Sequence, residues 1–477
     1  MPTWIITAVL IFNTIVIVYF VLYSSAQMLC AAVSAFWLIR HRRRRRRRAR
    51  ALVHHLSDPP GISLVVAAYN EELTIVESLR ALLKVDYPRR EIIVVNDGSR
   101  DGTLALLQRT FRLVPAPLGY VEHIPTAPVR GVYRSLDEPD LIVIDKENGG
   151  AKADASNAGI NAASMRGVMA LDADTILEPD ALSRAILPFL EDPSTIAVGA
   201  AVGIVNGSRV EAGRVVETRM PRNWLARCQV LEYLRAFLMF RLAMTPANAV
   251  PLLSGAFGLF DRKALLEVGG YDHASIGEDM DLTMRLHRLY RERRQPYRIA
   301  YEPEPLCWTQ APEDLRSLRS QRTRWRRGFL QVLAAQVRMI GNPRYGTVGL
   351  ITLPYLVVFD GLGPLLEVGG LVLSTTAALS GILNGHSYRV FVGASVLLSA
   401  ACSFFAVLLN DLAFRRYRRP QDLVVLFMAA FAENVGYRQL VAWWKCVGTW
   451  QMLSGGGGGS WGSIKRKTLA TKPVAPL

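Results

Sequence analysis

Apolar residues are concentrated in long runs at both ends of the chain, and short apolar runs alternate with polar ones between them. The first long run covers residues 4–39, where Ser24, Ser25 and Gln27 form the polar break without any Gly or Pro beside them. About 20 apolar residues span a bilayer. The run therefore predicts one long or tilted transmembrane helix, and it is too long for the core of a secretory signal peptide.

The middle of the chain has the pattern of an α/β domain. Short runs rich in β-branched residues predict buried strands, and helical stretches follow the first two. Alternating strands and helices predict a mainly parallel, Rossmann-like sheet with ligands at the carboxyl ends of its strands. Residues 111–139 are rich in proline and predict a long connection. The predicted strands are residues 62–67, 92–95, 141–144 and 168–171, and the predicted helices are residues 71–83 and 103–112.

Two further membrane spans are predicted after residue 348. They cover residues 353–379 and 390–409. The link 415–419 is basic, which predicts a cytoplasmic position. The amphipathic stretch 223–242 fits either the core or the membrane surface.

The last apolar stretch, residues 423–453, is interrupted by Glu433, Asn434, Arg438 and Lys445. Charge inside hydrocarbon is costly. We therefore expect a re-entrant or interfacial helix pair there and not a clean span. A tail with five consecutive glycines follows, and its composition predicts a flexible cytoplasmic end.

These patterns divide the chain into five parts. We expect an N-terminal transmembrane helix, a basic juxtamembrane linker, an α/β domain, C-terminal transmembrane or interfacial helices, and a flexible tail. Their predicted bounds are 1–40, 41–60, 61–340, 341–453 and 454–477.

The formal charge of +16 comes largely from one segment. Nine arginines, namely Arg40, Arg50 and residues 42–48, follow the first apolar run and leave +7 for the rest of the chain. Such a run can bind nucleic acid. Its place beside a predicted span favours a positive-inside anchor that meets anionic lipid, so we expect membrane lipids and no nucleic acid as partners. The five cysteines show no metal-site spacing, which is typical of a reduced or membrane setting.

Polar side chains follow two of the predicted strands. Residues 67–72 read Ala-Ala-Tyr-Asn-Glu-Glu, and residues 94–103 contain Asn-Asp-Gly-Ser. A nucleotide base needs a narrow slot, backbone groups and an acceptor for its ring N–H. Asn70, Glu71 and Asp97 can supply these groups. An ordinary Asp-Gly turn is the alternative for the second string.

Asp172 and Asp174 flank one small residue directly after a predicted strand. Two carboxylates at that spacing can hold a hard divalent ion, Mg²⁺ or Mn²⁺, which also binds two phosphates. The ion would neutralise charge on a departing diphosphate. A strand-to-loop turn without an ion is the alternative.

A loop with Gly149 and Gly150 precedes Lys152 and Asn157. The glycines let backbone N–H groups approach a phosphate, and Lys152 adds a cation. This is not a Walker loop, because Ser or Thr does not follow the lysine. A solvated surface loop is the alternative.

Residues 277–279 read Gly-Glu-Asp, and Asp279 is the predicted general base. Sugar hydroxyls are poor nucleophiles, and a carboxylate beside the acceptor removes the proton as the bond forms. A helix amino terminus with favourable acidic charge is the alternative.

Residues 321–325 read Gln-Arg-Thr-Arg-Trp and put three candidate side chains on one helical turn. Trp325 offers a face on which a pyranose ring stacks, Arg324 can bind diphosphate, and Gln321 can hydrogen-bond the acceptor. An amphipathic helix that touches lipid is the alternative.

Together, in this order and between membrane segments, these strings resemble the processive family 2 glycosyltransferases, which include the cellulose, chitin, hyaluronan and poly-N-acetylglucosamine synthases. The resemblance covers residues 62–330. It implies a GT-A-like fold, a UDP-sugar donor held by Asn70, Glu71 and Asp97, and an inverting reaction with Mg²⁺ or Mn²⁺. Many cellulose and poly-N-acetylglucosamine synthases have Thr where this chain has Gly277, which leaves the sugar open.

The expected function is transfer of a sugar from a UDP-sugar to a growing β-linked polysaccharide by a multi-pass inner (plasma) membrane protein. Its α/β domain would lie in the cytoplasm and Met1 outside. Transfer to a lipid acceptor stays open, because the predicted spans are few, and so does an accessory subunit. A binding protein with an inactive transferase domain and a nucleic-acid binder are the other classes. Release of UDP from a candidate donor would exclude the inactive binding protein. A nucleic-acid binder predicts binding that falls steeply with salt, so its absence would exclude that class.

Overall fold

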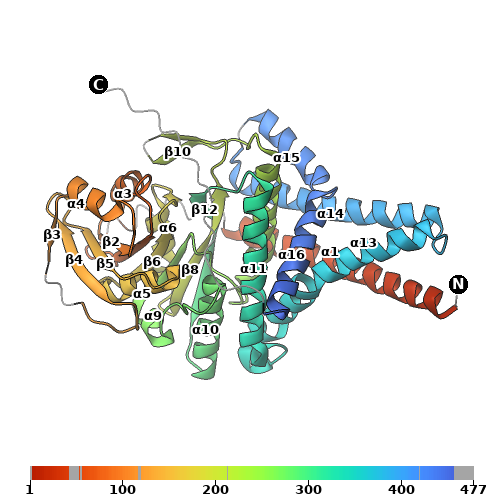
Figure 1. Ribbon diagram of the computed structural model, residues 1–477, viewed down its shortest axis with the longest axis horizontal. Coiled ribbons are helices and arrows are strands. Elements are labelled where there is room, and N and C mark those ends of the chain that lie inside the picture. Colours follow the sequence, from red (N-terminus) through yellow and green to blue (C-terminus); the bar gives the residue numbers. More distant parts are fainter. Residues whose placement is uncertain are drawn as a thin grey trace.

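The computed structural model describes residues 3–41, 53, 56–116, 120–211, 213–417 and 419–455. A sheet with its helices forms one end of the molecule, and three long apolar helices project from the other (Figure 1). Two helices lie side by side between these parts. The projecting helices are α1 (Thr3–His41), α13 (Gly363–Leu379) and α14 (Gly385–Phe414), and those between are α11 (Leu315–Ala335) and α16 (Tyr437–Leu453).

Ten strands of the described chain form one sheet, in the order β3-β4-β5-β2-β1-β6-β11-β8-β12-β7. Its centre, from β5 to β6, is parallel and almost completely buried, and it contains the four strands that the sequence predicts. The strand bounds are β1 Ile62–Ala68, β2 Arg90–Asp97, β3 Leu113–Pro115, β4 Val129–Ser135, β5 Leu141–Lys146, β6 Gly167–Asp172, β7 Ile176–Leu177, β8 Thr195–Ile204, β11 Gly258–Asp261 and β12 Arg298–Thr309.

The prediction of a mainly parallel sheet is wrong for most pairs outside this centre, where only β8 and β12 are parallel among the described strands. β11 is antiparallel to both β6 and β8, and β4 is antiparallel to β5. Parallel neighbours need a crossover connection, usually a helix, whereas antiparallel strands do not. The sheet is therefore mixed. A separate hairpin pairs β9 (Arg209–Glu211) with β10 (Arg214–Glu217).

The prediction of one long connection over residues 111–139 is also wrong, because β3 and β4 lie within it. β3 is the edge strand of the sheet and β4 is its neighbour, and most residues of both strands are at least partly exposed. An edge strand with polar residues lacks the apolar run by which the buried strands are recognised.

Both predicted helices of the domain are present, and others complete its covering layers. The helix at 71–83 begins four residues later than predicted, because residues 71–74 form a turn. The helix bounds are α3 Ile75–Leu83, α4 Thr103–Thr110, α5 Lys152–Ala162, α6 Ala181–Glu191, α9 Arg262–Val268 and α10 Glu278–Glu292.

Within the described residues, three helical segments are long and apolar enough to cross a membrane, at Ile6–Arg40, Val348–Leu379 and Tyr388–Phe414. They agree with the three spans expected from the sequence, and the first is a single helix as predicted. The protein is therefore a membrane protein. The arginine run 42–48 with Arg50, most of the basic linker and the glycine-rich tail lie outside the described residues.

The stretch 223–242 lies in the core. It forms α7 (Trp224–Leu234) and a π-helical segment (Arg235–Arg241), which pack against the sheet, α1 and α14. The stretch 423–453 forms two helices, α15 (Pro420–Ala432) and α16, in agreement with the expected helix pair.

Two of the charges that interrupt this last stretch, Glu433 and Arg438, are paired. Arg235 binds both Glu433 and Ser403, so a guanidinium on the π-helical segment meets a carboxylate just after α15. Arg438 lies 2.8 Å from Glu367 and also donates to Ser399. Each charge is thus compensated inside the helical bundle, which makes its burial tolerable.

Removing one partner of the first pair should destabilise the protein strongly. Glu433→Leu leaves the guanidinium of Arg235 uncompensated, for which we expect a loss of about 3–5 kcal/mol. The double variant Arg235→Met with Glu433→Leu should recover part of that loss. Thermal unfolding in detergent measures both, with Glu211→Leu in the exposed pair Arg209–Glu211 as control. A double variant less stable than either single variant would contradict the pairing argument.

Candidate active site

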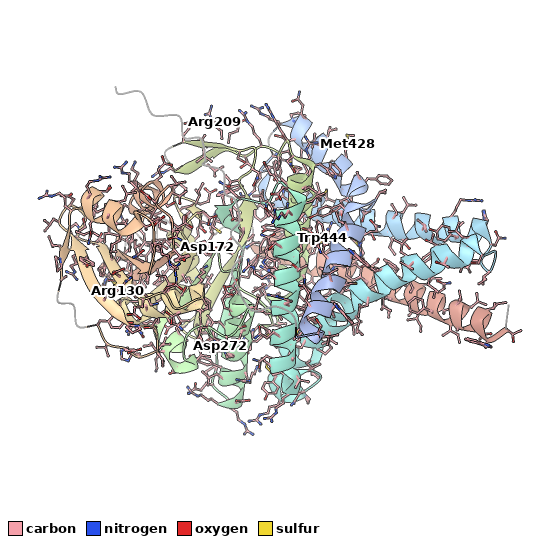
Figure 2. The ribbon with its side chains drawn as sticks, viewed as in Figure 1. Arg130, Asp172, Arg209, Asp272, Met428 and Trp444 are labelled. Atoms are coloured by element: carbon pink, nitrogen blue, oxygen red, sulfur yellow. The ribbon has the colours of Figure 1, made fainter. Side chains whose placement is uncertain are left out.

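The predicted site residues gather at one edge of the sheet. Asp97 ends β2, Lys146 ends β5 and Asp172 ends β6, and these strands are parallel, so their carboxyl ends share that edge. In the view of Figure 2, Asp172 lies between Arg130, at the outer side of the sheet domain, and helix α11. The site thus faces the helices that join the sheet to the membrane part.

The loops that follow β1 and β2 are hydrogen-bonded to each other. Asn70 has a left-handed backbone (φ 56°), its Oδ1 accepts from the N–H of Arg100 at 2.8 Å, and its N–H donates to Ser99 at 3.0 Å. The N–H of Glu71 donates to Thr103 at 3.0 Å. These bonds hold the two loops together. Asn70 uses its side chain to join the loops, which the sequence argument did not foresee.

Asp97 is buried and belongs to a charged cluster. Lys146 is completely buried, lies 2.8 Å from Asp97 and also pairs with Asp154. The N–H of Gly149 donates to Asp97 at 3.1 Å, and that of Gly150 donates to Asn148 at 2.8 Å. Both N–H groups therefore bond within the protein, and their approach to a phosphate stays a prediction.

Lys152 starts α5 and points toward Asp172, with Nζ 2.6 Å from the carboxylate. The same ammonium donates to the carbonyl of Gly255 at 3.2 Å, and the N–H of Gly255 donates to Asp279 at 2.7 Å. The backbone of one residue, Gly255, thus contacts both the lysine on the predicted phosphate side of the site and the predicted base. Asn157 does not share this position, because its amide makes two 2.8 Å bonds to the backbone of Tyr271.

The charges around Lys152 shift one another's ionisation. Burial lowers the pKa of Lys152, but Asp172, Asp279 and Glu278 outweigh it and hold that pKa above its ordinary value. Burial raises the pKa of Asp279, which Lys152 and the N–H of Gly255 partly offset. Burial, then the charge of Asp279, raises the pKa of Glu278 to about 7. Three carboxyl groups therefore surround one ammonium in a poorly solvated site, and such a site can bind a further cation.

Asp172 and Asp174 fit a divalent ion that arrives with a ligand. Asp172 has a side chain that is 33% exposed, and Asp174 is half-buried in the turn after β6. No group of three or more His, Cys, Asp or Glu side chains forms a metal site within the described residues. Mg²⁺ is commonly held by one or two carboxylates, with substrate phosphates and water as its other ligands.

Gln321, Arg324 and Trp325 lie on helix α11, as predicted. Oε1 of Gln321 is buried without a hydrogen-bond partner in the described part of the chain. Arg324 lowers the pKa of both Glu278 and Asp279, so it acts electrostatically on the predicted base. Trp325 is 42% exposed, and Arg322 lies 4.5 Å from its ring centre. Arg322 covers part of the ring, and the rest remains accessible.

The sequence argument assigned no role to Gly255, Glu278 or Arg322. Gly255 acts through its backbone, since an added Cβ would lie 2.6 Å from the carboxylate oxygens of Asp279. Arg322 is buried against Glu232 at 2.5 Å, and Glu232 also accepts from Tyr437. Their neighbours are distant in the chain, so the only sequence signal was their place inside motifs.

Two family profiles match the chain. The profile described as glycosyl transferase family 2 matches residues 63–269, and the one described as glycosyl transferase family group 2 matches residues 167–414, which is more than half of the 477 residues. The chain belongs to the family 2 glycosyltransferases.

Curated relatives of this family 2 glycosyltransferase include the poly-beta-1,6-N-acetyl-D-glucosamine synthases of Staphylococcus aureus (strain COL) and Staphylococcus epidermidis. They are 34% and 33% identical over 273 residues, which cover 57% of this chain and 55% of each relative. The chain thus matches about half the length of these relatives. The mannosyltransferase PcManGT from Pyrobaculum calidifontis, solved with GDP-Man and Mn²⁺, has a TM-score of 0.57 at 19% identity, over 90% of this chain and 99% of its own. This similarity supports the GT-A fold.

The raised pKa of Glu278 predicts a pH-dependent cost to the stability of this family 2 glycosyltransferase. Glutamate ordinarily has a pKa of 4.5, and here it is about 7, so its stabilising protonated form is lost as the pH rises through 7. Glu278→Gln mimics the protonated form. We expect the variant to gain up to about 3 kcal/mol relative to the native protein between about pH 5 and about pH 8.

Melting temperatures at both pH values, in a chelating buffer, measure this difference. Glu292→Gln, at the exposed end of the same helix, serves as control and should show no such gain. An equal change in melting temperature at both pH values for Glu278→Gln would refute the burial argument.

Proposed function

We propose that this protein is a membrane-bound inverting glycosyltransferase that adds sugars from a UDP-sugar to a growing β-linked polysaccharide. The observation that carries the proposal is the chain of contacts Asp172–Lys152–Gly255–Asp279. It joins the groups suited to a diphosphate and the group suited to a base through the backbone of one residue, Gly255.

The donor would lie along the edge of the sheet. The uracil and ribose would bind against the joined loops that carry Asn70, Glu71 and Asp97. The diphosphate would lie near Lys152, whose ammonium supplies positive charge from the first turn of α5. Asp172 and Asp174 would hold Mg²⁺ or Mn²⁺, which supplies Lewis-acid neutralisation of the leaving diphosphate.

Asp279 would act as the general base on the acceptor hydroxyl. Its raised pKa makes it a better proton acceptor than an exposed aspartate, and the N–H of Gly255 orients one of its oxygens. One base and no covalent intermediate invert the anomeric centre, so an α-linked donor yields a β-linked product. When Glu278 is protonated, Asp279 would have no negative charge on the neighbouring residue.

The acceptor would lie on helix α11. Trp325 offers a partly exposed ring for a pyranose, Gln321 an unsatisfied buried acceptor atom, and Arg324 a cation close to the base. The names of the relatives favour a polymer of N-acetylglucosamine over a lipid product. UDP-N-acetylglucosamine is therefore the proposed donor, and an accessory subunit is not required by this assignment.

The α/β domain and the tail would face the cytoplasm of an inner (plasma) membrane protein. The arginines beyond α1 and the basic residues 415–419 support this orientation, because positive charge is retained on the cytoplasmic side. Met1 would lie outside.

Purified protein in lipid vesicles should make a polymer from UDP-N-acetylglucosamine. UDP-glucose, UDP-glucuronate and GDP-mannose serve as control donors, and products are separated into vesicle lipid and high-mass glycan. Chelation of divalent ions should abolish synthesis, and Mg²⁺ or Mn²⁺ should restore it. Labelled lipid without polymer would replace the polymer assignment by the glycolipid one. Full activity after chelation would refute the metal role.

Asp279→Asn should keep the shape of the site and remove the base. We expect turnover at least ~100-fold lower, the usual weight of general-base catalysis, with donor binding close to normal. Initial rates of UDP release and calorimetric binding of the donor measure the two effects. Asp272→Asn, which changes an exposed carboxylate, is the matched control. Near-native turnover in Asp279→Asn would exclude this residue as the base.

A further inference from the structure

One face of helix α11 carries both the predicted acceptor residues and a contact with the loop before the base. Gln321, Arg324, Gly328 and Gln331 follow one another at spacings of three, four and three residues. Residues at these spacings lie on the same side of an α-helix. The first two are site candidates. Gly328 and Gln331 take no part in the proposed chemistry.

Gly328 touches the backbone of residues 274–277, which precede the proposed base Asp279 and are called the base loop. A Cβ added to Gly328 would lie 2.7 Å from the nitrogen and 2.9 Å from the Cα of Gly277, which is the residue before helix α10. A Cβ added to Gly277 would lie 3.1 Å from the carbonyl carbon of Gly328. The two backbones are thus in direct contact, two residues before Asp279. The contact is tighter for a side chain on Gly328 than for one on Gly277.

Gln331 binds the same loop at two points. Its Oε1 accepts from the N–H of Ile276 at 2.9 Å, and its Nε2 donates to the carbonyl of Ala274 at 2.9 Å. One amide side chain therefore replaces two backbone partners that this irregular segment would otherwise lack.

The base is held from the other side as well. Gly255 donates to Asp279, and Thr283 donates to the carbonyl of Asp279 at 2.8 Å while accepting from Leu253. Asp279 thus lies between the strand-side loop 253–255 and helix α11. A shift of either support moves the carboxylate relative to Gln321, Arg324 and Trp325.

We propose that Gly328 and Gln331 are positioning residues. They hold the base loop against helix α11 and so set the distance between the base and the acceptor. The inference rests on the proposed function, since it concerns the base Asp279. An alanine at Gly328 needs a displacement of about 0.7 Å to reach an ordinary contact of 3.4 Å, and an alanine at Gly277 needs about 0.3 Å. Misplacement by about 1 Å can cost ~100-fold in rate.

Steady-state kinetics with UDP-N-acetylglucosamine test the positioning role of Gly328. Gly328→Ala should lower kcat at least ~10-fold and leave the donor KM within ~2-fold, and Gly277→Ala should lower kcat less. Gly393→Ala is the matched control, because it is a helical glycine whose added Cβ meets nothing within 4 Å. Native kcat in Gly328→Ala, or a larger loss in Gly277→Ala, would overturn the proposal.

Gln331 provides a second test that does not depend on activity. Gln331→Leu removes both bonds, and Gln331→Glu keeps an acceptor for Ile276. Amide exchange in residues 272–280 should rise in Gln331→Leu and stay close to native in Gln331→Glu, and kcat should be higher in the second variant. Native exchange in Gln331→Leu would refute the proposal that Gln331 holds the base loop. If the native protein transfers no sugar while exchange changes as expected, the proposed function fails but the contact between α11 and the base loop is confirmed.

Discussion

The buried ammonium of Lys152 organises the site. It lies between Asp172, at the end of a central strand, and the carbonyl of Gly255, whose N–H reaches Asp279. Burial of a charge is costly unless it is paired and hydrogen-bonded. Asp172 pairs with Lys152 directly, and Asp279 also stabilises its charge, so that requirement is met. In the proposed reaction Asp172 would also bind a divalent ion, and Asp279 would take the proton of the acceptor.

Helix α11 connects this charged edge to the membrane part. Asp314 caps its first turn, and along its length it contacts the base loop, presents Trp325 and packs against α16. Arg326 turns to the opposite side and donates to the carbonyls of Asp360 and Gly361 near α13. A displacement of the membrane helices would therefore reach the acceptor side of the site through one rigid element. This geometry suits synthesis at a membrane.

Prediction from sequence worked where a residue's environment is set by its neighbours in the chain. The buried strands β1, β2, β5 and β6 have continuous apolar runs, and the first span is an uninterrupted apolar helix. It failed for β3 and β4, whose partly exposed residues leave no apolar signature, and it did not foresee the contacts of Gly149 and Gly150. Their N–H groups bond Asp97 and Asn148. Turn-forming glycines look the same whether their N–H groups face a ligand or the protein.

The sequence by itself determined the family-type motifs, the four central strands with the helices that follow the first two, and the apolar segments that make this a membrane protein. Those features depend on residue type and short spacing, which the chain displays directly. Only the tertiary structure decided that Lys152 pairs with Asp172, that Arg235 pairs with Glu433, and that Gly277 touches Gly328. Each of these contacts joins residues from different elements, and their energies depend on burial and distance. Those two quantities exist only after the sheet, helix α10 and the membrane helices have packed together.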